Sequence, residues 1–121
     1  MDMPSASQSM KRHCLVLDSD TLGRGDDELG GRLMVNFLRT LGFLDHPPEV
    51  AVCYNGGVRL AVGDSLALPF LQVLAEKGTE IILCGTCVDH FNIRDRIAVG
   101  RIADMHTIVE SLMRADSLIT T

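Results

Sequence analysis

Short apolar runs alternate with segments of helical periodicity along the chain, and this alternation limits the possible folds more than any other feature. The first run, 14–17, is apolar throughout and ends at Asp18, which is typical of a strand buried on both faces. A helix is predicted after it, because apolar residues then recur at helical spacing: Leu29, Leu33, Phe37 and Leu41. Repeated strand–helix units connect through right-handed crossovers, so the sequence predicts an α/β fold with a mainly parallel sheet.

The rest of the chain continues this alternation. Further strands are predicted, in chain order, at 49–54, 79–83, 97–100 and 117–120. Two helices are predicted between them, at 65–77 with Ser65 as N-cap and at 88–91 with Asn92 as a left-handed stop. The last helix follows Asp104 as N-cap and carries the most regular apolar spacing: Met105, Ile108, Val109, Leu112 and Met113. We therefore predict a three-layer α/β/α fold with a mainly parallel sheet of about five strands.

The chain has 121 residues, which corresponds to one domain. Residues 1–11 have no apolar periodicity and are predicted to be a disordered leader, with the domain at 12–121. No apolar stretch is long enough to span a membrane, and no signal peptide is visible. The four cysteines are therefore expected to be free thiols in a reducing cytoplasm.

Charge and hydropathy narrow the choice of partners. Lys and Arg number 11 against 16 Asp and Glu, and aromatic residues make up 4%, so a nucleic-acid groove is not expected. The mean hydropathy of +0.20 is high for so acidic and small a chain. A sheet covered by helices on both faces would account for part of this hydropathy, and apolar surface buried between subunits would account for more. We therefore expect a homo-oligomer.

The motif Cys84-Gly85-Thr86-Cys87 is the strongest chemical signal in the sequence. It lies where a strand is predicted to end and a helix to begin, and free N–H groups at a helix start lower the pKa of a cysteine. We expect Cys84 to be the nucleophile and Cys87 to resolve or share the sulfur, although the reverse assignment also fits. Cys14 and Cys53 fall in the middle of predicted strands and are expected to be core residues.

A metal site at the same motif is not expected. Cys84, Cys87 and His90 could supply three soft ligands on one helical turn, but the local sequence offers no fourth. A domain of this size also folds without a structural metal. We predict neither a metal nor another cofactor.

Two further loops should meet the cysteine motif at the carboxyl edge of the sheet, where α/β folds collect their ligands. The first, 18–25, resembles the Asp-x-Asp motif of haloacid-dehalogenase phosphatases, but lacks a suitably placed lysine. Its glycines also depart from dinucleotide-binding spacing. Together with the turn at 55–57, these loops give the candidate binding residues: Asp18, Asp20, Gly23, Gly25, Asn55, Gly56, Gly57, Gly85 and Thr86.

The segment 78–87, Gly-Thr-Glu-Ile-Ile-Leu-Cys-Gly-Thr-Cys, resembles the DsrE/DsrF-like sulfur-relay family, most closely the C-terminal domain of YedF-type selenium-metabolism proteins. Segments 17–25, 55–58 and 99–105 fit the same pattern. The resemblance implies a three-layer α/β/α fold, cytoplasmic homo-oligomers and a cysteine that carries persulfide sulfur or selenium. YedF-type proteins add an N-terminal TusA-like domain with a Cys-Pro motif, which this chain lacks, so a TusA-like carrier is a candidate partner.

Three functions remain open from the sequence. The first is a sulfur or selenium carrier with sulfurtransferase-like activity, in which a thiolate accepts sulfane sulfur and passes it to a partner protein. The second is a thiol–disulfide switch, which exchanges electrons instead of sulfur. The third is a non-catalytic oligomeric module that binds a small ligand or partner through the loops at 18–25 and 55–57.

Overall fold

A five-stranded parallel sheet forms the centre of the computed structural model, which describes residues 11–121. The strand order is β4-β3-β2-β1-β5, and every neighbouring pair is parallel. The strands are β1 His13–Leu17, β2 Val50–Cys53, β3 Glu80–Cys84, β4 Arg101–Ala103 and β5 Ser117–Thr120. The predicted parallel sheet of five strands is confirmed. The leader predicted at 1–11 lies outside the described residues except for Lys11, which is exposed.

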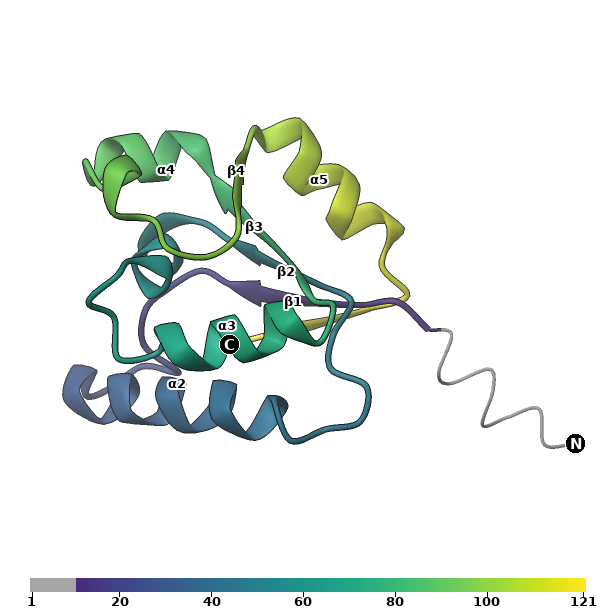
Figure 1. The fold of residues 1–121 in the computed structure, drawn as a ribbon, viewed down its shortest axis with the longest axis horizontal. Coiled ribbons are helices and arrows are strands. Elements are labelled where there is room, and N and C mark those ends of the chain that lie inside the picture. Colours follow the sequence, from purple (N-terminus) through teal and green to yellow (C-terminus); the bar gives the residue numbers. More distant parts are fainter. Residues whose placement is uncertain (1–10) are drawn as a thin grey trace, which may run out of the picture.

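Helices cover both faces of this sheet (Figure 1). The helices are α2 Asp27–Leu41, α3 Leu68–Glu76, α4 Gly85–His90 and α5 Met105–Arg114, with 3-10 turns η1 Asn55–Ala61 and η2 Arg94–Arg96. In Figure 1, α2 and α3 lie below the sheet and α5 lies above it, in contact with β2 and β3. The predicted three-layer α/β/α architecture is confirmed.

The central strands are buried along most of their length. All four residues of β2 and the last four of β1 are buried, as expected for strands covered on both faces. Cys14 and Cys53 are fully buried in this layer, which confirms them as core residues. Burial raises the pKa of Cys53 from an ordinary 9.0 to about 12, because a thiolate there would lose its hydration.

The predicted strand at 97–100 is wrong. The fourth strand begins at Arg101, and Ile97 forms an isolated antiparallel bridge with Val62. Gly100 separates the two segments with φ +84°, and a Cβ on it would approach the carbonyl oxygen of Ile81 to 2.9 Å. The chain therefore turns at Gly100 in a left-handed conformation that favours glycine, and it enters the sheet only afterwards.

Two predicted helix starts also shift. Ser65 does not cap α3: its hydroxyl and carbonyl oxygens accept bonds from the N–H groups of Ala67 and Leu68, forming a separate turn before the helix. Helix α4 begins at Gly85 instead of residue 88, so it follows β3 with no intervening loop. The left-handed stop at Asn92 is confirmed, with φ 56°.

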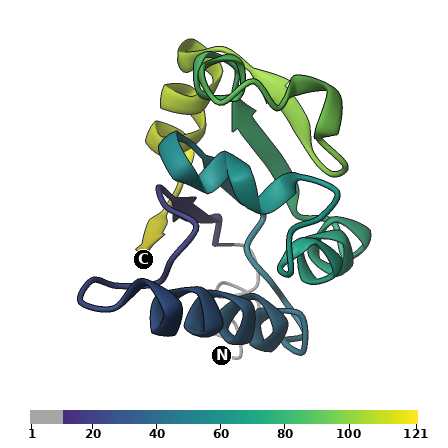
Figure 2. The same ribbon diagram turned by 90° about the vertical axis from the view of Figure 1, so that its left-hand side faces the viewer.

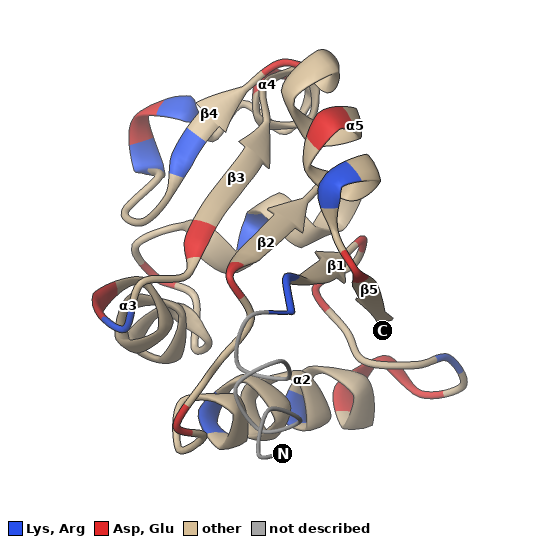
Figure 3. Cartoon of the chain, turned by 90° about the vertical axis from the view of Figure 1, so that its right-hand side faces the viewer, with Lys and Arg blue, Asp and Glu red and all other residues tan. Residues whose placement is uncertain are grey.

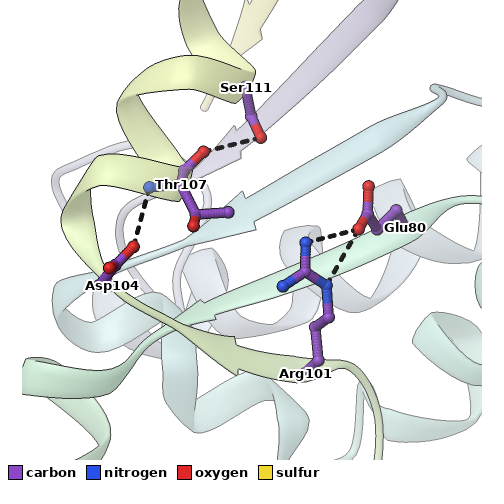
Figure 4. Close-up of polar contacts among 5 residues, drawn as sticks. All are labelled: Glu80, Arg101, Asp104, Thr107 and Ser111. Carbon is purple, nitrogen blue, oxygen red and sulfur yellow. Dashed lines mark hydrogen bonds and ion pairs between the residues drawn. The ribbon is translucent and has the colours of Figure 1, made fainter.

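Polar contacts fix the edge strand β4 and the start of α5 (Figure 4). The guanidinium of Arg101 donates two hydrogen bonds to one carboxylate oxygen of Glu80, of 2.8 and 3.0 Å. The Asp104 carboxylate accepts the Thr107 N–H at 2.9 Å, and this bond lowers the pKa of Asp104. Asp104 is therefore the N-cap, as predicted. Figure 3 shows acidic and basic residues mixed along the ribbon. Among them, Glu80 on β3 and Arg101 on β4 form an ion pair between adjacent strands.

Candidate functional site

Three segments meet at the carboxyl edge of the sheet, which faces the viewer in Figure 2. They are the loop 18–26 after β1, the turn η1 after β2 and the helix α4 after β3. The N–H of Tyr54 donates to the carbonyl oxygen of Leu17 at 3.1 Å, and η1 contacts α4. The sequence placed its candidate residues on these three segments, and the fold brings the segments together.

A backbone hydrogen bond joins two of these segments at sulfur. The N–H of Asn55, the first residue of η1, donates to Sγ of Cys87 on α4 at 3.0 Å. Asn55 adopts a left-handed conformation, with φ 51°, which asparagine tolerates better than most residues. An N–H directed at sulfur favours the anionic form over the neutral thiol.

Cys84 occupies a different environment from the one predicted. It is the last residue of β3 and the N-cap of α4, but its side chain makes no hydrogen bond to the first helical turn. The side chain continues the buried face of the strand and is only 2% exposed. Cys87, one turn later on α4, is partly exposed. The more accessible thiol of the motif is therefore Cys87, whereas the sequence favoured Cys84 as the nucleophile.

The pKa of Cys87 is raised above its ordinary value. Burial is the largest cause, and the neighbouring Cys84 thiol raises the pKa further, through a side-chain hydrogen bond and through charge. The Asn55 N–H acts in the opposite direction. The two cysteines are thus close enough to influence each other's ionisation, and the backbone donor partly offsets the penalty of burying a thiolate.

Gly57 allows close packing at this edge. A Cβ on Gly57 would overlap the carbonyl oxygen of Leu17, so the absence of a side chain lets η1 lie directly against the end of β1. A Cβ on Gly56 would lie 3.6 Å from the backbone nitrogen of Asp20, which is ordinary van der Waals contact. Of these two candidate binding residues, Gly57 therefore positions the site, and sterics do not require glycine at 56.

Arg59 connects the acidic loop to the cysteine helix, and the sequence analysis missed it. Its guanidinium lies 3.6 Å from the carboxylate of Asp20 and 4.1 Å from the centre of the Phe91 ring. The N–H of Phe91 in turn donates to the carbonyl oxygen of Cys87. The sequence Asn-Gly-Gly predicts a turn at 55–57 only, whereas the 3-10 turn η1 continues to Ala61 and carries Arg59.

The other candidate residues have local roles in the structure. Gly23 and Gly25 have φ of +77° and +132° and no neighbouring atoms where a Cβ would lie, so they shape an exposed turn. Gly85 packs α4 against β4, since its Cβ would lie 3.3 Å from Ile102. Asp18 and Thr86 are exposed. None of these five residues hydrogen-bonds to a cysteine sulfur in the described part of the chain.

Residues 11–121 contain no group of three or more His, Cys, Asp or Glu side chains arranged to hold a metal ion. His90, the third ligand considered in the sequence analysis, instead packs edge-to-face on Phe91 with ring centres 5.2 Å apart. The chemistry available at the motif is therefore that of two thiols, a backbone N–H and a nearby guanidinium.

An open cavity of about 1040 Å³ lies beside this site, between α2 and the segment 59–67. Leu29, Leu33 and Leu66 give it an apolar part. Asp20 and Arg59 also line it, and the Arg59 guanidinium lies over the ring of Phe91, the residue that follows α4. None of the cysteines lines this cavity.

Solved structures of other proteins share this fold. No protein-family model and no curated protein matches the chain. Among solved structures, the YchN protein of E. coli superposes with a TM-score of 0.65 and 17% identity, covering 93% of this chain and all of that one. MTH1491 of Methanobacterium thermoautotrophicum, described as a protein of unknown function, gives 0.66 and 20%, covering 92% and 99%.

The chain has the same fold as these two proteins. Identities of 17% and 20% establish this fold and leave the chemistry to be argued from the residues of this chain. Within the described residues, no helix is both long enough and apolar enough to cross a bilayer.

Proposed function

We propose that this protein is a DsrE/DsrF-like sulfur carrier, which holds sulfane sulfur as a persulfide on Cys87. The observation that carries the proposal is the 3.0 Å hydrogen bond from the Asn55 N–H to Sγ of a partly exposed cysteine. A cysteine that accepts and donates sulfane sulfur reacts in anionic forms, first as a thiolate and then as a persulfide anion. A fixed backbone donor stabilises such an anion without adding a basic side chain.

The loading step is a sulfur transfer between thiols. The Cys87 thiolate attacks the outer sulfur of a donor persulfide, the donor S–S bond breaks, and the donor leaves as a thiolate. Cys87 then holds the added sulfur as a persulfide. Release is a second transfer of the same kind. An acceptor thiolate attacks the outer sulfur of the Cys87 persulfide, the S–S bond breaks, and Cys87 leaves as a thiolate.

Cys84 provides a second way to release the sulfur from Cys87, as hydrosulfide. Its thiol lies beside Cys87 and is shielded from solvent, so it is poorly placed to meet a protein donor. As a thiolate it can attack the inner sulfur of the Cys87 persulfide, forming a Cys84–Cys87 disulfide and expelling hydrosulfide. We assign Cys87 as the acceptor and Cys84 as the resolving thiol, the reverse of the order favoured from the sequence.

The raised pKa of Cys87 sets a condition on loading. At neutral pH most Cys87 is protonated, so its attack requires loss of the thiol proton. Loading should therefore accelerate as pH rises toward the pKa. The reaction needs reduced cysteines and thus a reducing compartment such as the cytoplasm.

The proposal implies a protein partner on each side of the transfer. A TusA-like carrier is the candidate donor, suggested by the resemblance of the Cys-Gly-Thr-Cys segment to YedF-type proteins. Selenium reacts with thiols in the same manner, so the same cysteine could hold either element. The mass added on loading distinguishes them.

Load-and-release mass spectrometry tests the function. The reduced protein is incubated with a cysteine persulfide donor, desalted, and then exposed to an excess of an acceptor thiol. The proposal expects the intact mass to rise by one sulfur atom and to return after the acceptor is added, with no gain in the Cys87→Ser variant. Equal loading of wild-type and Cys87→Ser protein would contradict it.

The influence of the Cys84 thiol on the pKa of Cys87 also favours a second candidate, a thiol–disulfide switch. In that case two thiols lose two hydrogen atoms to an oxidant and form a disulfide without gaining sulfur. The same experiment separates the functions when it is followed over time. A switch loses two hydrogens and never shows the added sulfur, whereas a carrier shows the added sulfur first and reaches the disulfide only after hydrosulfide is expelled.

A further inference from the structure

The turn η1 and the helix α4 meet at two pairs of residues with the same sequence separation. Asn55 donates its N–H to Sγ of Cys87, and the guanidinium of Arg59 lies over the Phe91 ring, 4.1 Å from its centre. Each pair is separated by 32 residues. Cys87 and Phe91 are four positions apart in a continuous helical turn, because the Phe91 N–H donates to the Cys87 carbonyl oxygen. The sulfur and the ring therefore lie on one side of the helix, toward η1.

Neither element can fix this geometry alone. Helix α4 has six residues, and a helix this short has little stability of its own. The turn η1 is a 3-10 helix, whose hydrogen bonds have poorer geometry than those of an α-helix. Val88 is the buried residue of α4 and ties the helix to the core. The distance from the Asn55 nitrogen to the Cys87 sulfur therefore depends on the contacts between η1 and α4.

The Arg59 side chain joins three segments. It projects from η1, its guanidinium lies 3.6 Å from the Asp20 carboxylate in the loop after β1, and it covers the Phe91 ring at the end of α4. The ion pair with Asp20 is half exposed, so by itself it stabilises the fold little. A guanidinium this close to an aromatic ring is attracted by the negative face of the ring. The cation–π contact is therefore the interaction through which Arg59 holds α4.

We propose that Arg59 is a positioning residue, which binds the Phe91 ring, holds α4 against η1 and so keeps the Asn55 N–H on the Cys87 sulfur. The inference rests on the proposed function, in which Cys87 accepts the sulfur. Of the described residues, Cys84 is the only titratable group that shifts the pKa of Cys87, so Arg59 acts through position and not through its charge. Loss of Arg59 should weaken the N–H···S bond and reduce the thiolate fraction of Cys87.

The pH profile of Cys87 alkylation tests this role. Arg59→Met keeps the aliphatic stem and removes the charge, so the profile should move to higher pH and the rate near pH 8 should fall roughly threefold to tenfold. Arg59→Lys keeps a cation that can lie over Phe91 and should restore most of the wild-type rate. Arg94→Met is the matched control: Arg94 is also half exposed and pairs with Asp89 on α4, but it does not contact the ring. Its profile should match the wild type.

A double-mutant cycle tests the route through the ring. Phe91→Leu should shift the Cys87 profile in the same direction, and Arg59→Met should add nothing further in that background. Urea unfolding verifies that each variant is folded at the assay pH. An unchanged profile in Arg59→Met, an equal shift in Arg94→Met, or fully additive effects of Arg59→Met and Phe91→Leu would each overturn the proposal.

Alkylation needs no sulfur donor, so the result is independent of the carrier function. Sulfur loading on Cys87 together with an unchanged alkylation profile in Arg59→Met would overturn the role of Arg59 alone. A shifted profile in a protein that takes up no sulfur would contradict the carrier function and support the positioning of Cys87 by Arg59.

Discussion

The backbone N–H of Asn55 donates to Sγ of Cys87 at 3.0 Å, although 32 residues separate the two in the sequence. The bond exists because β2 and β3 are neighbours in a parallel sheet and their carboxyl ends lie at one edge. The turn that follows β2 therefore reaches the helix that follows β3. The thiol chemistry proposed for this protein depends on that juxtaposition.

The conformation of Asn55 provides the first prediction. Asn55→Val places a β-branched residue at φ 51°, where it is strained, and the turn should relax and move its N–H away from Cys87. Alkylation of Cys87 at pH 8 should slow several-fold as the pKa of the thiol rises. Asn55→Gly, which accepts this conformation, should keep the wild-type rate. Equal alkylation rates in the two variants would show that the Asn55 hydrogen bond does not control the reactivity of Cys87, which would contradict the prediction.

Removal of Cys84 should make Cys87 more reactive. The Cys84 thiol raises the pKa of Cys87, so Cys84→Ala should lower that pKa and increase the thiolate fraction at a given pH. The pH profile of Cys87 alkylation should shift to lower pH, with a several-fold faster rate near pH 8. A slower rate would mean that Cys84 lowers the pKa of Cys87, and this would contradict the prediction.

The buried thiol of Cys53 predicts a loss of stability at high pH. Its folded pKa of about 12 lies above the value in the unfolded chain, so the thiol form stabilises the fold below pH 9. That contribution falls by about 1.4 kcal/mol for each pH unit from there toward pH 12. Cys53→Val should lose less stability between pH 8 and 10.5 in urea unfolding. A pH dependence identical to wild type would contradict the assigned burial.

Gly57 should be the glycine least tolerant of substitution. A Cβ there would overlap the Leu17 carbonyl, so Gly57→Ala must displace η1 from the end of β1 and should cost at least about 3 kcal/mol. Gly31→Ala is the matched control: it lies within α2 with open space around it and should stabilise by about 0.5–1 kcal/mol. Urea unfolding of both variants gives the comparison, and a mild effect at Gly57 would be inconsistent with the close approach.

The periodic parts of the sequence predicted most of the fold. The apolar run 14–17 predicts a buried strand, and these four residues are buried in β1. The spacing of the leucines at 29 and 33 correctly predicts a helix at α2, but both are exposed, and the buried apolar side chains of α2 are Met34 and Leu38. Asp104 is recognisable as a cap because a carboxylate directly precedes a regular apolar helical repeat. The strand predicted at 97–100 failed because Gly100, with φ +84°, reverses the chain before it reaches β3. Apolar content alone does not show such a turn.

The site was predictable only in part. The carboxyl-edge rule brought the Cys-Gly-Thr-Cys motif and the turn at Asn55 together, but it could not show which sulfur faces solvent. That depends on the strand running one residue further than predicted, so that Cys84 takes an inward position in β3. The bridge from Arg59 to Asp20 and Phe91 involves three segments and leaves no local pattern in the sequence.

Site-resolved mapping of the added sulfur tests the central claim most directly. Wild-type protein is loaded with a sulfane sulfur donor, its persulfides are blocked with an alkylating reagent, and the peptides carrying each of the four cysteines are analysed by tandem mass spectrometry. The account predicts that the extra sulfur lies on Cys87 at early times, with Cys14 and Cys53 unmodified. Early loading on Cys84, or no sulfur on any of the four, would contradict it.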